Sequence, residues 1–196
     1  MPAFRIAVDD RVLATVDTTG MAVIDIRVTS MRTWQPRATL EVAGLPVDAP
    51  TDTRASIYFV TEYQLVAGQR VTVELLTAGA TSPAGKTAAE LYPDDPPYAP
   101  TDFSPTLATR ADYAARPVFH DSFEFSFIAS TGTTAAARIP TGHEGVSFNI
   151  LWPYLDENEA HMSVRSDGPF LSAEHPGAVY VREKLHVGGS LTYTVV

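Results

Sequence analysis

The chain has 196 residues, of which 45% are hydrophobic and 19% charged, a composition typical of a folded domain and unlike that of a disordered one. Its formal net charge of −9 argues against nucleic acid as a partner, because the phosphates would be repelled. The absence of Cys excludes disulfides and thiolate metal ligands.

Two further absences concern location. No apolar run approaches the roughly 20 residues of a membrane-spanning helix. After Met1 the chain enters a strand pattern without the basic start and apolar core of a signal peptide. Together with the lack of Cys, this predicts a cytoplasmic protein that does not bind membranes.

Residues 1–76 consist of short runs rich in Val, Ile, Thr, Tyr and Phe that alternate with polar residues. This alternation, with turns at intervals of about ten residues, is typical of a β-sandwich or barrel. It predicts strands at residues 3–8, 11–16, 21–29, 38–43, 55–62 and 69–76. Asp9-Asp10 predicts a tight hairpin connection, and Thr18-Thr19-Gly20 a second short turn.

Residues 77–121 differ in composition, since they hold seven of the chain's 15 Pro residues. Pro lacks a backbone donor, so this segment is not expected inside a sheet. One short helical turn is predicted at residues 87–92, ended by Pro93 and held by packing. The aromatic residues Tyr92, Tyr98 and Phe103 argue against a purely disordered linker. We therefore expect a partly ordered strap.

Residues 122–196 resemble residues 1–76, with predicted strands at 123–129, 134–139, 146–151, 160–165, 178–183 and 189–195. Val23 aligns with Val146 at an offset of 123 residues, and the offset falls in single steps to 120, where Thr72 aligns with Thr192. Six strand-like runs in the same order indicate an internal duplication.

The predicted fold class is therefore all-β, with two duplicated β-sandwich-like modules of about six antiparallel strands each. Module one spans 1–76, the Pro-rich strap 77–121 and module two 122–196. Because about 75 residues are near the lower limit for an independent core, the modules either share an interface or fuse into one continuous sandwich.

Candidate binding residues lie in the two equivalent loops that follow the third strand of each module. Loops that differ on a common scaffold are where binding tends to reside, and Trp can anchor a partner or close a core. Their opposite charge also permits contact between the modules, or pairing of chains. The candidates are Arg32, Trp34 and Arg37 in the first loop, and Trp152, Tyr154, Asp156, Glu157 and Glu159 in the second.

No cofactor or metal ion is expected. Residues 80–87 loosely match a phosphate-binding loop, but Ala80 replaces its first Gly and Pro83 deletes a needed N–H. The acidic run 156–159 lacks the spacing of a Ca²⁺ loop, and the five His residues lack metal-ligand spacing. No nucleophile elbow is present.

These observations favour a non-catalytic binding or assembly protein that engages a protein partner, or itself, through loops of the duplicated modules. One alternative is a carbohydrate-binding module that uses the aromatic and acidic loops. Another is an enzyme whose site lies in a cleft between the modules near His143, Glu144, Asp156 or His161.

Overall fold

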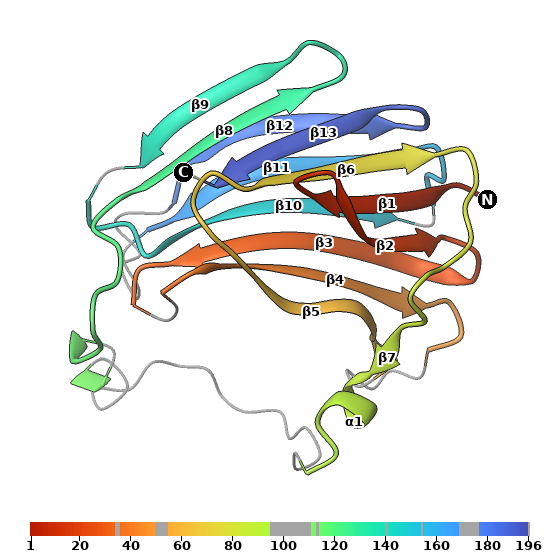
Figure 1. Ribbon diagram of the computed structural model, residues 1–196, viewed down its shortest axis with the longest axis horizontal. Coiled ribbons are helices and arrows are strands. Elements are labelled where there is room, and N and C mark those ends of the chain that lie inside the picture. The colour runs from red at the N-terminus through yellow and green to blue at the C-terminus, as the bar shows by residue number, and fades with distance from the viewer. Residues whose placement is uncertain are drawn as a thin grey trace.

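The computed structural model describes residues 1–33, 36–49, 55–94, 111–112, 114–139, 141–153, 155–168 and 177–195. Its secondary structure is dominated by antiparallel strands in two sheets, so the all-β prediction is confirmed (Figure 1). All twelve predicted strands are present, with ends that differ from the predicted ones by a few residues.

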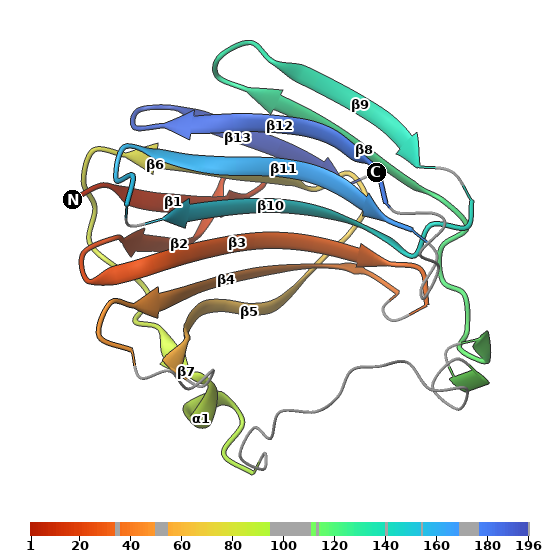
Figure 2. The ribbon, with the colours of Figure 1, turned by 180° about the vertical axis from the view of Figure 1, so that it is seen from behind.

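The two sheets differ in size and are called here sheet A and sheet B. Sheet A contains, in spatial order, β2 (Arg11–Asp17), β1 (Ala3–Val8), β6 (Arg70–Leu76), β13 (Ser190–Val195), β8 (Phe123–Ala129) and β9 (Thr134–Ile139). Sheet B contains β12 (Val179–His186), β11 (Glu159–Asp167), β10 (Gly145–Pro153), β3 (Met21–Met31), β4 (Ala38–Pro46), β5 (Ile57–Leu65) and β7 (Lys86–Thr87). Sheet B lies nearest the viewer in Figure 2.

Each sheet contains strands from both halves of the chain, arranged symmetrically. In sheet A, β2-β1-β6 from the first half lie beside β13-β8-β9 from the second. In sheet B, β12-β11-β10 lie beside β3-β4-β5. The alignment of residues 1–76 with residues 122–196, called here the self-match, makes β6 equivalent to β13 and β3 equivalent to β10. These equivalent strands meet at the centre of each sheet. A duplication would produce this order; the duplication itself remains a prediction.

The strand register corrects the self-match by one residue in β3. The offset of 123 aligns inward-facing Ile26 with Asn149, which lies on the outer face of sheet B. Because alternate residues of a strand point to opposite faces, a shift of one residue exchanges the faces. An offset of 122 aligns Ile26 with Phe148, and both of these side chains are fully buried.

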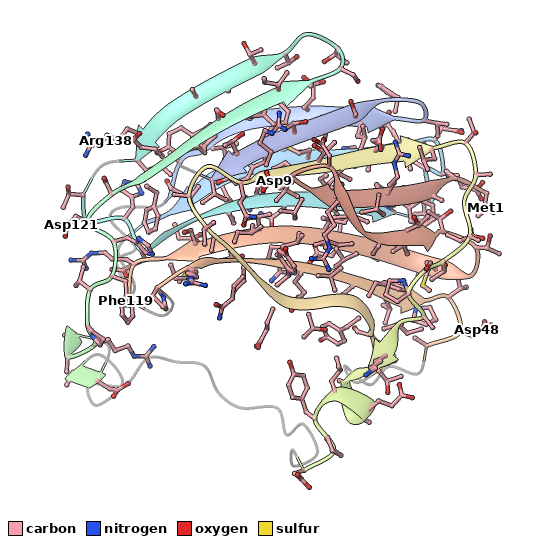
Figure 3. All side chains as sticks on the ribbon, in the orientation of Figure 1. Met1, Asp9, Asp48, Phe119, Asp121 and Arg138 are labelled. Atoms are coloured by element: carbon pink, nitrogen blue, oxygen red, sulfur yellow. The ribbon has the colours of Figure 1, made fainter. Side chains whose placement is uncertain are left out.

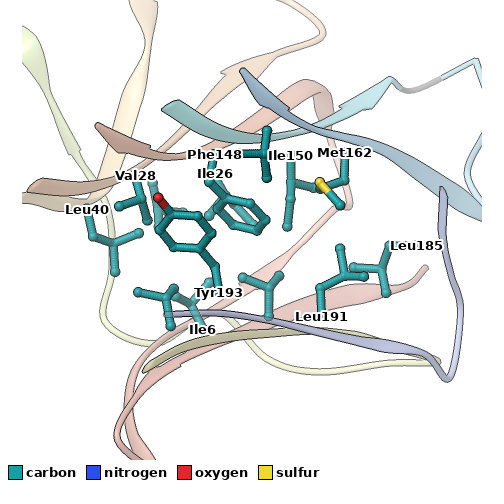
Figure 4. Packing of buried hydrophobic residues seen from close by; sticks show 14 of the residues in the cluster. Ile6, Ile26, Val28, Leu40, Phe148, Ile150, Met162, Leu185, Leu191 and Tyr193 are labelled. Atoms are coloured by element: carbon teal, nitrogen blue, oxygen red, sulfur yellow. The ribbon is translucent and has the colours of Figure 1, made fainter. Parts of the chain in front are cut away.

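The core lies between the sheets and is built by the inward-facing residue of each alternating pair. Tyr193 of sheet A stacks on Phe148 of sheet B with ring centroids 4.9 Å apart (Figure 4). Burial raises the pKa of the Tyr193 hydroxyl. A buried aromatic ring of this size contributes about 1.5–3 kcal/mol through removal of apolar surface from water.

The predicted hairpin at Asp9-Asp10 is a two-residue connection in which both residues have positive φ, 48° and 66°. Two consecutive left-handed residues are the mark of a type I′ turn, whose twist suits antiparallel strands. The Asp9 carboxylate accepts hydrogen bonds of 3.0 Å from the backbone N–H of Arg70 and from Gln69 Nε2. The turn is thereby attached to the start of β6.

The predicted helical turn is α1 (Ala88–Leu91), which begins after Thr87 and has Tyr92 as its C-cap. Thr87 and Glu90 form a capping box, since the Thr87 side chain accepts from Glu90 N–H and the Glu90 carboxylate accepts from Thr87 N–H. Just before α1, β7 pairs with β5. No helix in the described ranges is long and apolar enough to cross a membrane.

Candidate functional site

The two loops predicted to carry binding residues lie at opposite ends of the sandwich. They follow β3 and β10, which are antiparallel neighbours: Met31 pairs with Gly145, and Val23 with Pro153. The end of β3 is therefore next to the start of β10. The described residues of the first loop, which carries Arg32 and Arg37, therefore do not meet those of the second loop, which carries Asp156, Glu157 and Glu159, within one chain.

Trp152 is fully buried, and its indole Nε1 donates a hydrogen bond of 3.3 Å to the Glu157 carbonyl. This Trp closes the core at one end of sheet B and has no ring surface to offer a sugar or a protein. Trp34 and Tyr154 lie outside the described residues.

The two Arg residues of the first loop differ in environment. Arg32 is half-buried; its backbone N–H donates to the Glu144 carbonyl at 2.8 Å and its own carbonyl accepts from Phe119 N–H. Arg37 is exposed and lines a pocket of about 310 Å³ with His120. The main chain at Arg32 thus joins three segments at this end of the molecule.

The acidic residues of the second loop are divided between solvent and an ion-pair cluster. Asp156 and Glu157 are exposed. Glu159, at the start of β11, accepts a hydrogen bond of 2.6 Å from Lys184 Nζ, which lowers the pKa of the Glu159 carboxyl and raises that of the Lys184 ammonium.

The residues suggested for a cleft between modules are not gathered in one place. Glu144, preceding β10, is buried, and its N–H donates to the Asp167 carbonyl at 3.0 Å. Asp156 lies at the other end of β10, and His161 lies on the outer face of sheet B. Among the described residues, no group of three or more His, Cys, Asp or Glu is placed to hold a metal ion.

A groove of about 970 Å³ lies on the outer face of sheet B, across β12, β11, β10 and β3. Figure 2 shows these four strands side by side. We call this groove the sheet B groove. Its lining contains four of the chain's 14 Lys and Arg residues and two of its five His, against two carboxylates, Asp25 and Glu183. The basic lining residues are Arg27, His161, Arg165, Arg182, Lys184 and His186. The lining of the groove thus carries more basic than acidic side chains in a chain of net charge −9.

Strand alternation explains why these side chains line the groove. In β11, Met162 and Val164 are buried in the core, so His161, Ser163 and Arg165 point outward. The strand register then places outward residues of four strands in rows.

One row crosses the middle of the groove. Arg182 pairs with Ser163, Ser163 with Asn149, and Asn149 with Arg27. Small polar side chains form the floor of this row and guanidinium groups stand at its two ends. Asn149 Nδ2 also donates to Ser147 Oγ at 3.0 Å, which orients the amide along the floor.

Two of the four Lys and Arg side chains already have a carboxylate partner. Arg27 forms an ion pair with Asp25. Burial opposes the charge of Arg27, but Asp25 and then Glu41 outweigh burial, so the pKa of Arg27 is raised. Lys184 is held by Glu159. These two cations are positioned by the protein itself.

Arg165 and Arg182 form no ion pair with any carboxylate in the described ranges. Arg165 Nη2 donates a hydrogen bond of 3.2 Å to Ser163 Oγ, which directs the guanidinium toward the Arg182 row. A guanidinium presents five donors in a planar fork that suits carboxylate. Asp167, two residues along β11, interacts electrostatically with Arg165 without forming an ion pair. The groove therefore holds two Arg side chains without an ion pair and two basic side chains that have one.

Sequence reasoning missed the sheet B groove, although a local signal was present. His161, Ser163 and Arg165 alternate with buried residues, and Arg182 and Lys184 stand two positions apart on the neighbouring strand. Basic and polar residues at every second position of two strands indicate a polar, partly charged sheet face. Which strands are neighbours, however, cannot be read from the alternation.

No family model, no curated protein and no solved structure matches this chain.

Proposed function

We propose that this protein is a non-catalytic binding protein whose sheet B groove receives an acidic segment of a protein partner. The observation that carries the proposal is the pair of guanidinium groups, Arg165 and Arg182, which form no ion pair in the described part of the chain and stand above a floor of Ser163 and Asn149. Charge complementarity in such a groove supplies orientation and a faster encounter.

The size of the groove favours an extended segment over a small anion. Four neighbouring strands span roughly 15 Å, because strands lie about 4.8 Å apart. That length accommodates about four or five residues of extended chain. Arg182 and Arg27 stand near the two ends of this span, so acidic side chains about four residues apart in the ligand would reach both.

Two other classes of ligand, carbohydrate and nucleic acid, fit the groove less well. No Trp, Tyr or Phe side chain lines the described groove, so neither a sugar ring nor a base finds an aromatic surface on which to stack.

The test is fluorescence anisotropy with labelled hexaglutamate, at low ionic strength where screening is weakest. We expect an affinity for hexaglutamate that weakens with added salt. In R165A and in R182A the affinity should fall about tenfold or more, which corresponds to about 1.4 kcal/mol of binding free energy for each variant. The matched control is R11A, which removes the same charge from an exposed position on β2 of sheet A and should bind hexaglutamate as the unchanged protein does.

Labelled hexalysine and a sulfated tetrasaccharide serve as comparison ligands. Hexaglutamate binding that R165A and R182A leave unchanged would refute the groove as the site. Binding of the sulfated tetrasaccharide in preference to hexaglutamate would replace the protein partner with an acidic glycan, and the absence of binding to either would remove the proposal.

A further inference from the structure

The four edges of the two sheets differ in whether other segments or charged residues cover them. An edge strand exposes unpaired N–H and C=O groups to any passing strand, and proteins commonly cover or charge such edges. At the β2 edge of sheet A, Thr15 N–H donates to the Ser82 carbonyl at 2.7 Å and Ser82 N–H donates to the Thr15 carbonyl at 2.9 Å. The chain segment before α1 therefore covers this edge.

The two edges of sheet B are also modified. β12 carries the charged run Arg182, Glu183 and Lys184 along the edge, a common way to discourage pairing. At the other edge, β7 has only two residues, and α1 follows it directly. β7 covers only Ile57 and Tyr58 of β5. The rest of β5 carries the charged residue Glu62 with a φ of 48° at a register shift, and such a bulge also discourages pairing.

The β9 edge of sheet A has none of these devices within the described residues. β9 pairs with β8 alone and forms the outer border of the molecule in both views (Figures 1 and 2). Its sequence is Thr134-Ala-Ala-Ala-Arg-Ile139, so the first four residues are small or short and uncharged. Arg138, at the far end of the strand (Figure 3), is turned toward β8, where it pairs with Glu124 at 3.4 Å.

The hydrogen-bond alternation shows which groups of β9 face outward. Ala129 N–H of β8 donates to the Thr133 carbonyl at 2.8 Å. In an antiparallel ladder, hydrogen-bonded positions recur at every second residue. Odd-numbered residues therefore bond to β8, while Thr134, Ala136 and Arg138 direct their N–H and C=O groups away from the sheet.

We propose that β9 pairs with β9 of a second copy of this chain, antiparallel and centred on Ala136. In this register Ala136 faces its own counterpart, and Thr134 faces Arg138 of the other copy. No two like charges are then opposite each other, because the two Arg138 backbones lie about four residues, or roughly 13 Å, apart along the strand direction. The strand is thus complementary to itself, and pairing joins two copies of sheet A into one continuous sheet.

The contact is small. A six-residue strand pair buries less than the roughly 1,200–2,000 Å² of a stable interface, so we expect a reversible dimer that forms at micromolar or higher concentration. The surface lies on the edge of sheet A and the groove lies on sheet B, so either proposal can fail without the other.

Sedimentation equilibrium over a range from about 10 to 500 μM brackets the association expected of an interface this small. We expect the weight-average mass to rise toward twice the chain mass. A136P should stay monomeric: its missing N–H points outward, so no ladder bond within the chain is lost, and an edge strand tolerates Pro there. A136K is the second variant, which adds a charge at the centre of the contact.

The control is V12K, at an exposed position on β2, the strand of sheet A that Ser82 covers; it should dimerise like the unchanged protein. Amide hydrogen exchange adds a direct reading, since the N–H of Thr134, Ala136 and Arg138 should become protected only as concentration rises. A monomer at all concentrations, or a dimer that A136P and A136K leave intact, would overturn the proposal. A dimer without protection of these three amides would do the same.

Discussion

The hydroxyl groups of Thr72 and Thr192 lie 3.2 Å apart and form a hydrogen bond between β6 and β13. The same two residues face each other in the register of these strands and are equivalent in the self-match, 120 residues apart. Equivalent positions meet only where a two-fold relation between the halves passes through the sheet. The Thr pair therefore marks the centre of sheet A.

This bond gives the first prediction. T72V or T192V removes one hydroxyl and leaves the other without its partner, so we expect each to lower the free energy of unfolding by about 0.5–1.5 kcal/mol. The double variant T72V/T192V should lose less than the sum of the two, because no hydroxyl is left unpaired. Urea unfolding of all four proteins forms a double-mutant cycle, and strictly additive losses would show that the two hydroxyls are not coupled.

The buried Trp gives the second prediction. W152A should lower the free energy of unfolding by about 3–5 kcal/mol, because it leaves a large cavity at the end of the core and removes the donor to the Glu157 carbonyl. L155A is the matched control, since this neighbouring side chain is 89% exposed and its loss should change stability by less than about 0.5 kcal/mol. Equal urea midpoints for the two variants would contradict the placement of Trp152 in the core.

The third prediction concerns Glu41 on the outer face of sheet B. Burial raises its pKa above the ordinary 4.5, despite the attraction of Arg27. The folded state then holds this proton more tightly than the unfolded state, so the contribution of Glu41 to stability is fully present below the ordinary pKa of 4.5 and is lost as pH rises through the folded pKa. E41Q removes the charge and should be more stable than the unchanged protein at pH 7. This advantage should vanish at pH values below the ordinary 4.5.

Urea unfolding at neutral and acidic pH measures this difference. If E41Q were less stable at pH 7 and equal at acidic pH, attraction between Glu41 and Arg27 would outweigh burial, and the sign of the argument would be reversed.

The fourth prediction has the opposite sign and concerns Asp9. Hydrogen bonds from the backbone N–H of Arg70 and then from Gln69 lower its pKa below the ordinary 3.8. Stability from this carboxylate is present above pH 3.8 and is lost as pH falls through the folded pKa. D9N keeps the shape of the side chain and tolerates the positive φ. We therefore expect D9N to be less stable than the unchanged protein at neutral pH, with a difference that shrinks under acid conditions. A deficit independent of pH would indicate a purely conformational effect.

The strands themselves could be predicted from the sequence because their signal is local. In β11, Ala160, Met162 and Val164 alternate with polar residues, and only a strand places such a pattern on one face. The capping box of Thr87 and Glu90 is likewise local, since its two residues are three apart in the chain.

The register between equivalent strands could not be obtained in this way. Val23 and Val146 are the same residue type, so the self-match aligned them, although Val23 lines the outer groove and Val146 is buried. Apolar side chains occur on both faces of these strands. Similarity of residues therefore cannot distinguish an offset of 122 from one of 123, whereas the pairing of β3 with β10 does.

The sequence by itself determined the all-β class, the positions of the strands and the turns between them, since each depends on residues within a few positions of one another. Only the tertiary structure decided which strands are neighbours. Strand pairing brought Arg27 into one groove with Arg182, 155 positions away, and left the loops after β3 and β10 at opposite ends. Hydrogen-bonded pairing between distant segments sets these relations, and alternation along one strand carries no information about its partner.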